Sequence, residues 1–160
     1  MRNTLLPEDR KQLLVDKFFQ FSFREIEPDQ EFFKTITNPL EYHFIVDMYN
    51  WDDGAEVLTW IASNEICDKG TAKMIFWRSQ PSYYTRFLTA DEAEWDADIF
   101  TLNKLIIENF ETGFYKGEEI YYNPKEDPSA EGTDEIDPKA KWEIPGFMKD
   151  ASAGTKVKFD

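Results

Sequence analysis

The sequence predicts a mainly α-helical domain: a compact multi-helix bundle of antiparallel helical hairpins, with an irregular Pro- and Gly-rich C-terminal tail that packs back on it. Apolar residues recur at three- and four-residue steps between residues 7 and 113, as on one face of a helix. Hydrophobic residues make up 41% of the 160 residues, which is enough material for one domain with its own core. The predicted helices are separated by connections of about four to six residues, which is typical of antiparallel hairpins.

The first helix is predicted near residues 7–21, because Pro7 suits a first helical position and apolar residues follow at helical spacing. Phe18 and Phe21 should face inward. A short second helix should open at Pro28.

The third helix should begin at Asn38 and Pro39, which serve as N-cap and first residue. Its apolar stripe comprises Leu40, Phe44 and Met48. Asp52 or Asp53 can cap the fourth helix, because a carboxylate accepts hydrogen bonds from the free amides of a helix N-terminus.

Asp68 should cap a fifth helix that ends before Pro81. Thr89 and Glu92 have the spacing of a capping box. In this motif the Thr side chain bonds the backbone amide of the Glu residue, and the Glu side chain bonds the backbone amide of the Thr residue. The helix that follows should run to about Glu111, with Gly113 as its stop. Its buried stripe should comprise Ile99, Leu102, Ile106, Phe110 and then Phe114.

Beyond Gly117 the helical period disappears, and Pro and Gly become frequent. We therefore divide the chain into a helical domain, residues 1–117, and an acidic, mostly non-regular extension of the same domain, residues 118–160. The extension retains several large apolar side chains, so we expect it to dock on the helical body. These are Trp142, Ile144, Phe147, Met148, Val157 and Phe159.

The charge of the chain indicates the kind of partner it can bind. Eighteen Lys and Arg face thirty-two Asp and Glu, which gives a formal net charge of -14. Such a surface repels nucleic acids and anionic membranes and attracts basic proteins. We find neither a secretory signal at the N-terminus nor an apolar stretch of the roughly 18 residues that a membrane helix needs. We therefore expect a cytoplasmic protein, in which the lone Cys67 is a small buried thiol.

The acidic residues are unevenly distributed. Ten lie between Glu25 and Glu65, against one basic residue, Lys34, and acidic residues gather again between Thr89 and Glu111. One interpretation is a set of solvated helix faces and capping carboxylates. The other is a docking surface for a basic protein, whose approach it would steer over long range. The candidate contact residues are Asp52, Asp53, Glu56, Asp91, Glu92 and Glu94.

Candidate catalytic residues are few. His43 is the single histidine, and Asp47 follows it by four residues, but a zinc site needs three protein ligands. We interpret His43 as a structural residue, and we assign no catalytic residue, no metal ligand and no cofactor. Likewise, Trp51, Trp60, Trp77 and Trp95 lie mostly on apolar helix faces, which favours core packing.

Two short motifs carry a family resemblance. Tyr49-Asn50-Trp51-Asp52-Asp53-Gly54 leads into one helix, and Cys67-Asp68-Lys69-Gly70-Thr71-Ala72 leads into the next. Over about Pro39 to Tyr84, the chain resembles the bacterial domain-of-unknown-function family 4274. This resemblance implies a small bacterial protein from a polymorphic-toxin locus, where an acidic protein neutralises a neighbouring toxin; it implies no catalytic residue.

We therefore expect a non-enzymatic immunity protein that binds and occludes a cognate basic toxin domain. Two alternatives remain open: a metal-dependent enzyme with carboxylates around His43 and Asp47, and an adaptor or scaffold. Genomic neighbourhood separates them, because a toxin gene next to this one favours the first and an operon of metabolic genes favours the enzyme.

Overall fold

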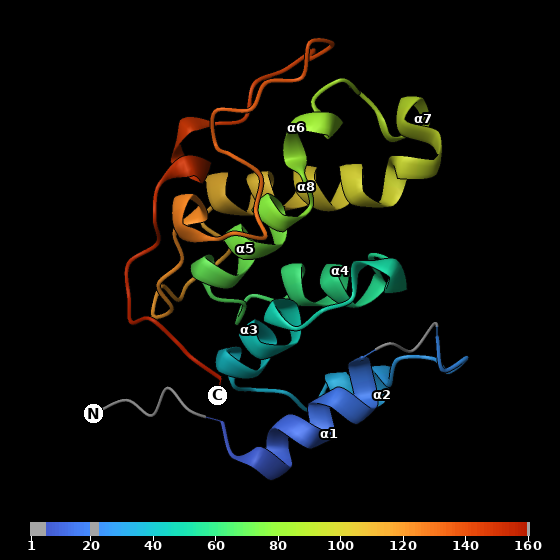
Figure 1. Ribbon diagram of the computed structural model, residues 1–160, viewed down its shortest axis with the longest axis vertical. Helices are drawn as coiled ribbons and strands as arrows, with labels where there is room; N and C mark the ends of the chain where they lie inside the picture. The colour runs from blue at the N-terminus through green and yellow to red at the C-terminus, as the bar shows by residue number, and fades with distance from the viewer. Residues whose placement is uncertain (1–5, 20–22, 160) are drawn as a thin grey trace.

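A computed structural model of the chain describes residues 6–19 and 23–159. Helices dominate these residues (Figure 1), and the mainly α prediction is confirmed. The α-helices are α1 (Glu8–Phe18), α2 (Gln30–Phe33), α3 (Pro39–Asp47), α4 (Glu56–Ala62), α5 (Lys69–Arg78), α6 (Pro81–Tyr84), α7 (Ala90–Ala93) and α8 (Ala97–Glu111). Short 3-10 turns are η1 (Trp51–Asp53), η2 (Glu94–Asp96), η3 (Pro124–Glu126) and η4 (Gly146–Lys149).

Several helix ends lie where the sequence predicts them. The Asn38 side chain accepts a hydrogen bond from the amide of Leu40, and the Asp68 side chain accepts one from Gly70. Gly113 follows α8 with a φ of 72°, the left-handed conformation that ends a helix. Helix α1 ends at Phe18, and Phe21 lies outside the described residues.

Other boundaries differ from the prediction. Asp52 and Asp53 do not cap α4, whose N-cap is Ala55; they form η1 instead, which the Asn50 side chain caps. Local sequence signals the presence of a cap but not which of two adjacent turns uses it.

The helix predicted from Thr89 to Glu111 is also not continuous. The Thr89 hydroxyl caps α7 as predicted, but α7 ends at Ala93 and α8 begins only at Ala97. Glu94 between them has a φ of 51°, which a continuous α-helix cannot contain.

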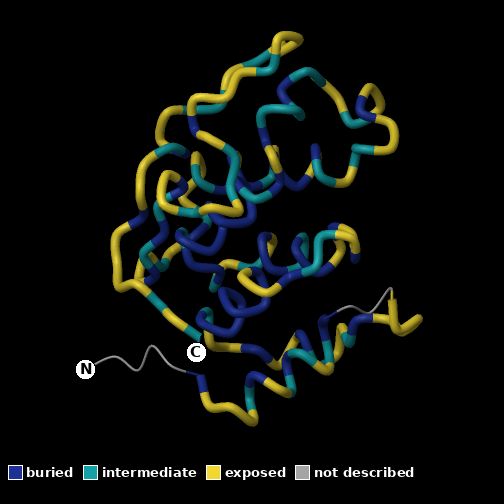
Figure 2. Tube along the Cα trace, viewed as in Figure 1, coloured by how far each residue is buried: buried dark blue, intermediate teal, exposed yellow. Residues whose placement is uncertain are grey.

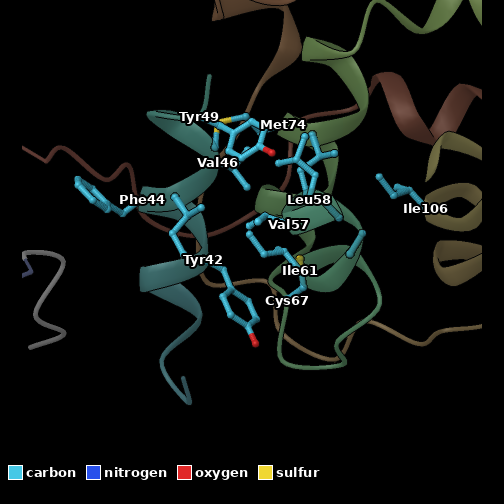
Figure 3. Packing of buried hydrophobic residues seen from close by; sticks show 14 of the residues in the cluster. Tyr42, Phe44, Val46, Tyr49, Val57, Leu58, Ile61, Cys67, Met74 and Ile106 are labelled. Atoms are coloured by element: carbon cyan, nitrogen blue, oxygen red, sulfur yellow. The ribbon is translucent and has the colours of Figure 1, made fainter. Parts of the chain in front are cut away.

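The core is built around α5, in which residues 71–77 are all buried. Helix α5 packs between α3 and α8, and α1 packs on α3 (Figures 1 and 2). Side chains from α3, α4, α5 and α8 therefore meet in one cluster, part of which Figure 3 shows. Apart from the neighbouring α7 and α8, the helices that pack together most are not consecutive in the chain. The hairpin arrangement stays a prediction.

The C-terminal extension covers the outer side of α5. The indole Nε1 of Trp77 donates to the Met148 carbonyl at 2.7 Å, and the Lys73 ammonium donates to the Asp150 carbonyl at 2.7 Å. Met148 is fully buried, whereas Phe147 beside it is 39% exposed. The predicted docking of the extension is therefore observed, although Phe147 takes little part in it. In the described part of the chain, no helix has the length and apolar character needed to cross a membrane.

Candidate functional site

The two acidic segments singled out by the sequence lie on one side of the molecule. Asn109, near the end of α8, donates a hydrogen bond to the carbonyl of Ala62, the last residue of α4. The two helices run in the same direction, so their N-terminal ends both lie on the right-hand side of Figure 1. Because η1 precedes α4 and because α7 and η2 precede α8, the fold brings both acidic segments to that side.

Most of the candidate contact residues are exposed there. Asp52, Glu56, Asp91, Glu92 and Glu94 are exposed, and Asp98 in the first turn of α8 joins them. We call these six residues the acidic side. Asp98 was not predicted, although it lies in the same acidic stretch between Thr89 and Glu111 as Asp91.

Asp53 is a correction, because it is only 8% exposed. The tight turn after η1, closed by the bond from the Tyr49 hydroxyl to the Gly54 carbonyl, places Asp53 against the body of the protein. Asp52 is exposed and its neighbour Asp53 is buried, although both carry the same charge. Charge alone therefore does not reveal which of the two faces solvent.

One member of the acidic side is already paired. The Lys141 ammonium lies 2.9 Å from the Glu92 carboxylate, and this bond, together with one from the Leu88 amide, lowers the pKa of Glu92. Across residues 6–19 and 23–159, no Lys or Arg forms an ion pair with Asp52, Asp91 or Asp98. Their charge therefore remains open to solvent or to a partner.

Trp95 is the second correction. Of the tryptophans assigned to the core, Trp77 is fully buried, whereas Trp95 is 98% exposed. It follows Glu94 directly, where the helix is interrupted, and therefore does not continue the apolar stripe of α8. A signal was present in the sequence: Asp91 lies four residues before Trp95 and Asp98 three residues after it, so its neighbours at helical spacing are largely acidic.

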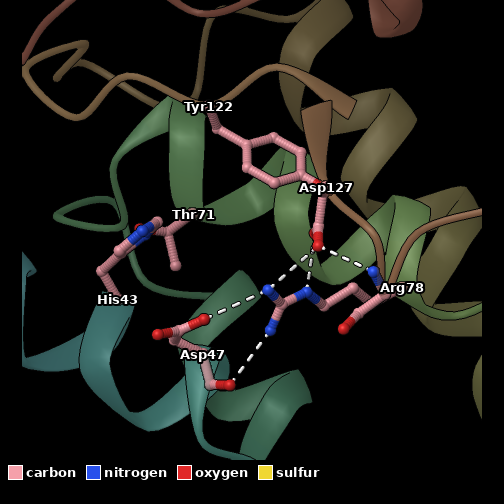
Figure 4. Close-up of polar contacts among 7 residues, drawn as sticks. His43, Asp47, Thr71, Arg78, Tyr122 and Asp127 are labelled. Atoms are coloured by element: carbon pink, nitrogen blue, oxygen red, sulfur yellow. Dashed lines mark hydrogen bonds and ion pairs between the residues drawn. The ribbon is translucent and has the colours of Figure 1, made fainter. Parts of the chain in front are cut away.

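His43 is a buried structural residue, as predicted. Its ring Nδ1 lies 2.8 Å from the Thr71 hydroxyl, and burial lowers its pKa to about 3, so the ring is neutral at physiological pH. Asp47 binds Arg78 (3.1 Å) rather than His43 (Figure 4). Within the described ranges, no three His, Cys, Asp or Glu side chains are grouped in a way that could hold a metal ion.

Arg78 instead joins three parts of the chain. Its guanidinium donates to the carbonyl and carboxylate of Asp47 at the end of α3, and to the carboxylate of Asp127 in the extension at 2.8 Å (Figure 4). The Tyr122 hydroxyl also donates to Asp127 at 2.8 Å. Burial alone would raise the pKa of Asp127, but the bonds from Arg78, Ser129 and Tyr122 outweigh it and lower the pKa. This cluster fastens the extension to the helical body.

Comparison with known proteins gives one match. Residues 37–111 match the family model described as "Domain of unknown function (DUF4274)". We refer to residues 37–111 as the DUF4274 domain, after the family model that they match. No curated protein and no solved structure matches the chain. The match extends past Tyr84 to the end of α8, so the whole acidic side belongs to the DUF4274 domain, whereas α1 and the extension lie outside it.

The extension forms its own surface next to the DUF4274 domain. Its loop 131–142 returns at Trp142, whose indole Nε1 donates to the Phe87 carbonyl at 2.8 Å. A pocket of about 530 Å³ lies between this loop and the end of α6, with Thr85, Asp137 and Trp142 in its wall. Charges of both signs line it, so the pocket favours no single class of ligand.

Proposed function

We propose that this protein is an immunity protein, which binds a basic toxin domain through the acidic side and covers its functional cleft. The observation that supports the proposal most is the common orientation of α4 and α8, which brings exposed carboxylates from two separate segments to one side. The family match is compatible with this function and assigns no activity of its own. We place the interaction in the cytoplasm.

The proposed mechanism begins with charge. A net charge of -14 creates a negative field that accelerates the approach of a positive protein surface. In the complex, carboxylates such as Asp52 and Asp91 would pair with Lys, Arg or His side chains of the toxin domain. The same field disfavours nucleic acids and anionic membranes as partners.

Co-expression with the product of the adjacent gene tests the biological role. We expect that product to arrest growth alone, and we expect the intact chain to restore growth and to form a complex with it. A product that is harmless alone, or that stays toxic beside the intact chain, would rule out the immunity function.

Charge reversal tests the acidic side directly. Asp52→Lys combined with Asp91→Lys should slow association with that product by about tenfold or more and weaken the dependence of the rate on salt. Glu108→Lys combined with Glu111→Lys makes the same change in net charge at the exposed C-terminal end of α8 and should slow association much less. Equal slowing by both double variants would show that net charge acts, and that the acidic side does not.

A further inference from the structure

Three large apolar side chains are exposed on segments next to α6 and α7, which lie in the upper half of Figure 1. Leu88 is 58% exposed, Trp95 is 98% exposed and Ile136 is 80% exposed. Leu88 lies in the connection between α6 and α7, and Trp95 lies in η2, directly after α7. Ile136 belongs to loop 131–142, the long excursion at the top of the same view. We call these three residues the apolar anchor.

Several bonds hold loop 131–142 against the segment that carries Leu88. The Arg86 guanidinium lies 2.7 Å from the Asp137 carboxylate, one residue after Ile136. The Lys141 amide donates to the Thr85 carbonyl at 2.7 Å, and the Lys141 ammonium pairs with Glu92 on α7. Residues of the extension are thus fixed beside the DUF4274 domain, although they are far from it in sequence.

The backbone around Trp95 is fixed as well. The Tyr83 hydroxyl donates to the Asp96 carboxylate at 2.8 Å, and the Arg86 guanidinium stacks 4.2 Å from the centre of the Tyr83 ring. The indole therefore projects from a turn whose neighbours are held in place. Binding therefore restricts mainly the side-chain torsions of Trp95, because the backbone around it is already held.

We propose that the apolar anchor is the centre of the docking surface and that it inserts into an apolar pocket, rimmed by Lys and Arg, on a basic protein. This inference rests on the proposed function and adds the extension to the binding surface. Exposed large apolar groups on segments that are bonded to one another are typical of interaction sites, and tryptophan is enriched among interface hot spots.

The negative charge around the apolar anchor indicates which kind of molecule binds it. Asp91, Glu94 and Asp98 are exposed around Trp95, and Asp134 and Glu135 are exposed next to Ile136. A second copy of this chain would bring an equally negative surface against these carboxylates, and an anionic lipid surface would be repelled in the same way. A basic protein with an apolar pocket can bury the apolar side chains and pair its Lys and Arg side chains with the carboxylates around them.

Alanine substitution tests the anchor, with the adjacent gene's product as the binding probe. Trp95→Ala should increase the dissociation rate of the complex by about tenfold or more, because a central tryptophan anchor is lost. Ile136→Ala should increase it as well, and an unchanged rate in this variant would remove the extension from the binding surface. Phe23→Ala is the matched control, because Phe23 is 82% exposed in the α1–α2 connection, at the opposite end in Figure 1. All three variants should retain the melting temperature of the unmodified chain.

The outcomes separate this inference from the proposed function. If the intact chain does not bind the probe, the proposed function fails and this inference fails with it. If the intact chain binds and Trp95→Ala dissociates no faster than Phe23→Ala, only the anchor is refuted. A self-association that Trp95→Ala abolishes, measured by sedimentation, would identify a second copy as the occupant and overturn the basic partner.

Discussion

At the scale of single residues, the environment decides the chemistry. His43 has Thr71 as its polar partner and the ring of Phe159 nearby, with ring centroids 6.1 Å apart, and so it is held neutral inside the protein. Trp95 is exposed instead, because the interruption at Glu94 leaves its indole in solvent. Neither residue's role follows from its type.

His43 makes stability depend on pH. The unfolded chain protonates this histidine as pH falls below about 6.5, whereas the folded protein does so only near its lowered pKa of about 3. The free energy of unfolding should therefore fall by up to about 1.4 kcal/mol per pH unit as pH decreases through this window. Urea unfolding between pH 6.5 and 5 measures the effect.

His43→Gln supplies the comparison, because glutamine can still bond the Thr71 hydroxyl but does not titrate. The slope between pH 6.5 and 5 should decrease in this variant. Arg78 lowers the pKa of His43 and Asp127 raises it, but both charges are constant over this range. An identical slope in both proteins would show that His43 is accessible to protons in the folded state.

At the scale of secondary-structure elements, α5 is the helix around which the others are organised. It contacts α3 on one side, α8 on another and the extension on its outer face. Gly70 allows the close approach of the extension: a Cβ at this position would overlap the Ile120 carbonyl, well inside van der Waals contact. The glycine that weakens the helix locally is therefore required by packing.

Gly70→Ala should lower stability by about 1 to 3 kcal/mol, because the added methyl group forces the extension away from α5. In a helix without this contact, the same change would stabilise by about 1 kcal/mol. Gly146→Ala is the control, because a Cβ there meets no atom within 4 Å. Thermal or urea unfolding of both variants decides the sign, and a more stable Gly70→Ala protein would contradict the packing described here.

At the scale of the whole molecule, the DUF4274 domain and the extension share one core. Asp68 is 1% exposed, and its carboxylate accepts hydrogen bonds from the amides of Glu119 (2.6 Å) and Ile120 (3.2 Å) as well as from Gly70. Asp68 therefore both caps α5 and binds the backbone of the extension. A buried carboxylate that loses such partners is costly.

Removing residues 118–160 should consequently abolish the cooperative unfolding transition. The truncation removes two of the amides bonded to Asp68 and exposes Trp77, whose indole Nε1 loses the Met148 carbonyl. Circular dichroism melting of residues 1–117 and of the intact chain tests this. A fragment that melts cooperatively at the same midpoint would show that the helical part is an independent domain.

The sequence by itself determined the features that depend on near neighbours. Helix formation, the caps at Asn38 and Asp68 and the stop at Gly113 each involve groups within about four residues, and the pattern records them directly. The negative charge and the family resemblance were also available from the sequence alone.

Tertiary structure alone decided which of the predicted residues form a surface. The exposure of Asp52 beside the buried Asp53, the partner of Asp47 and the exposure of Trp95 all depend on how distant segments pack. The common direction of α4 and α8, which unites the acidic side, also depends on contacts such as Asn109 with Ala62. Such contacts join residues that are far apart in the chain, and a local periodicity holds no information about them.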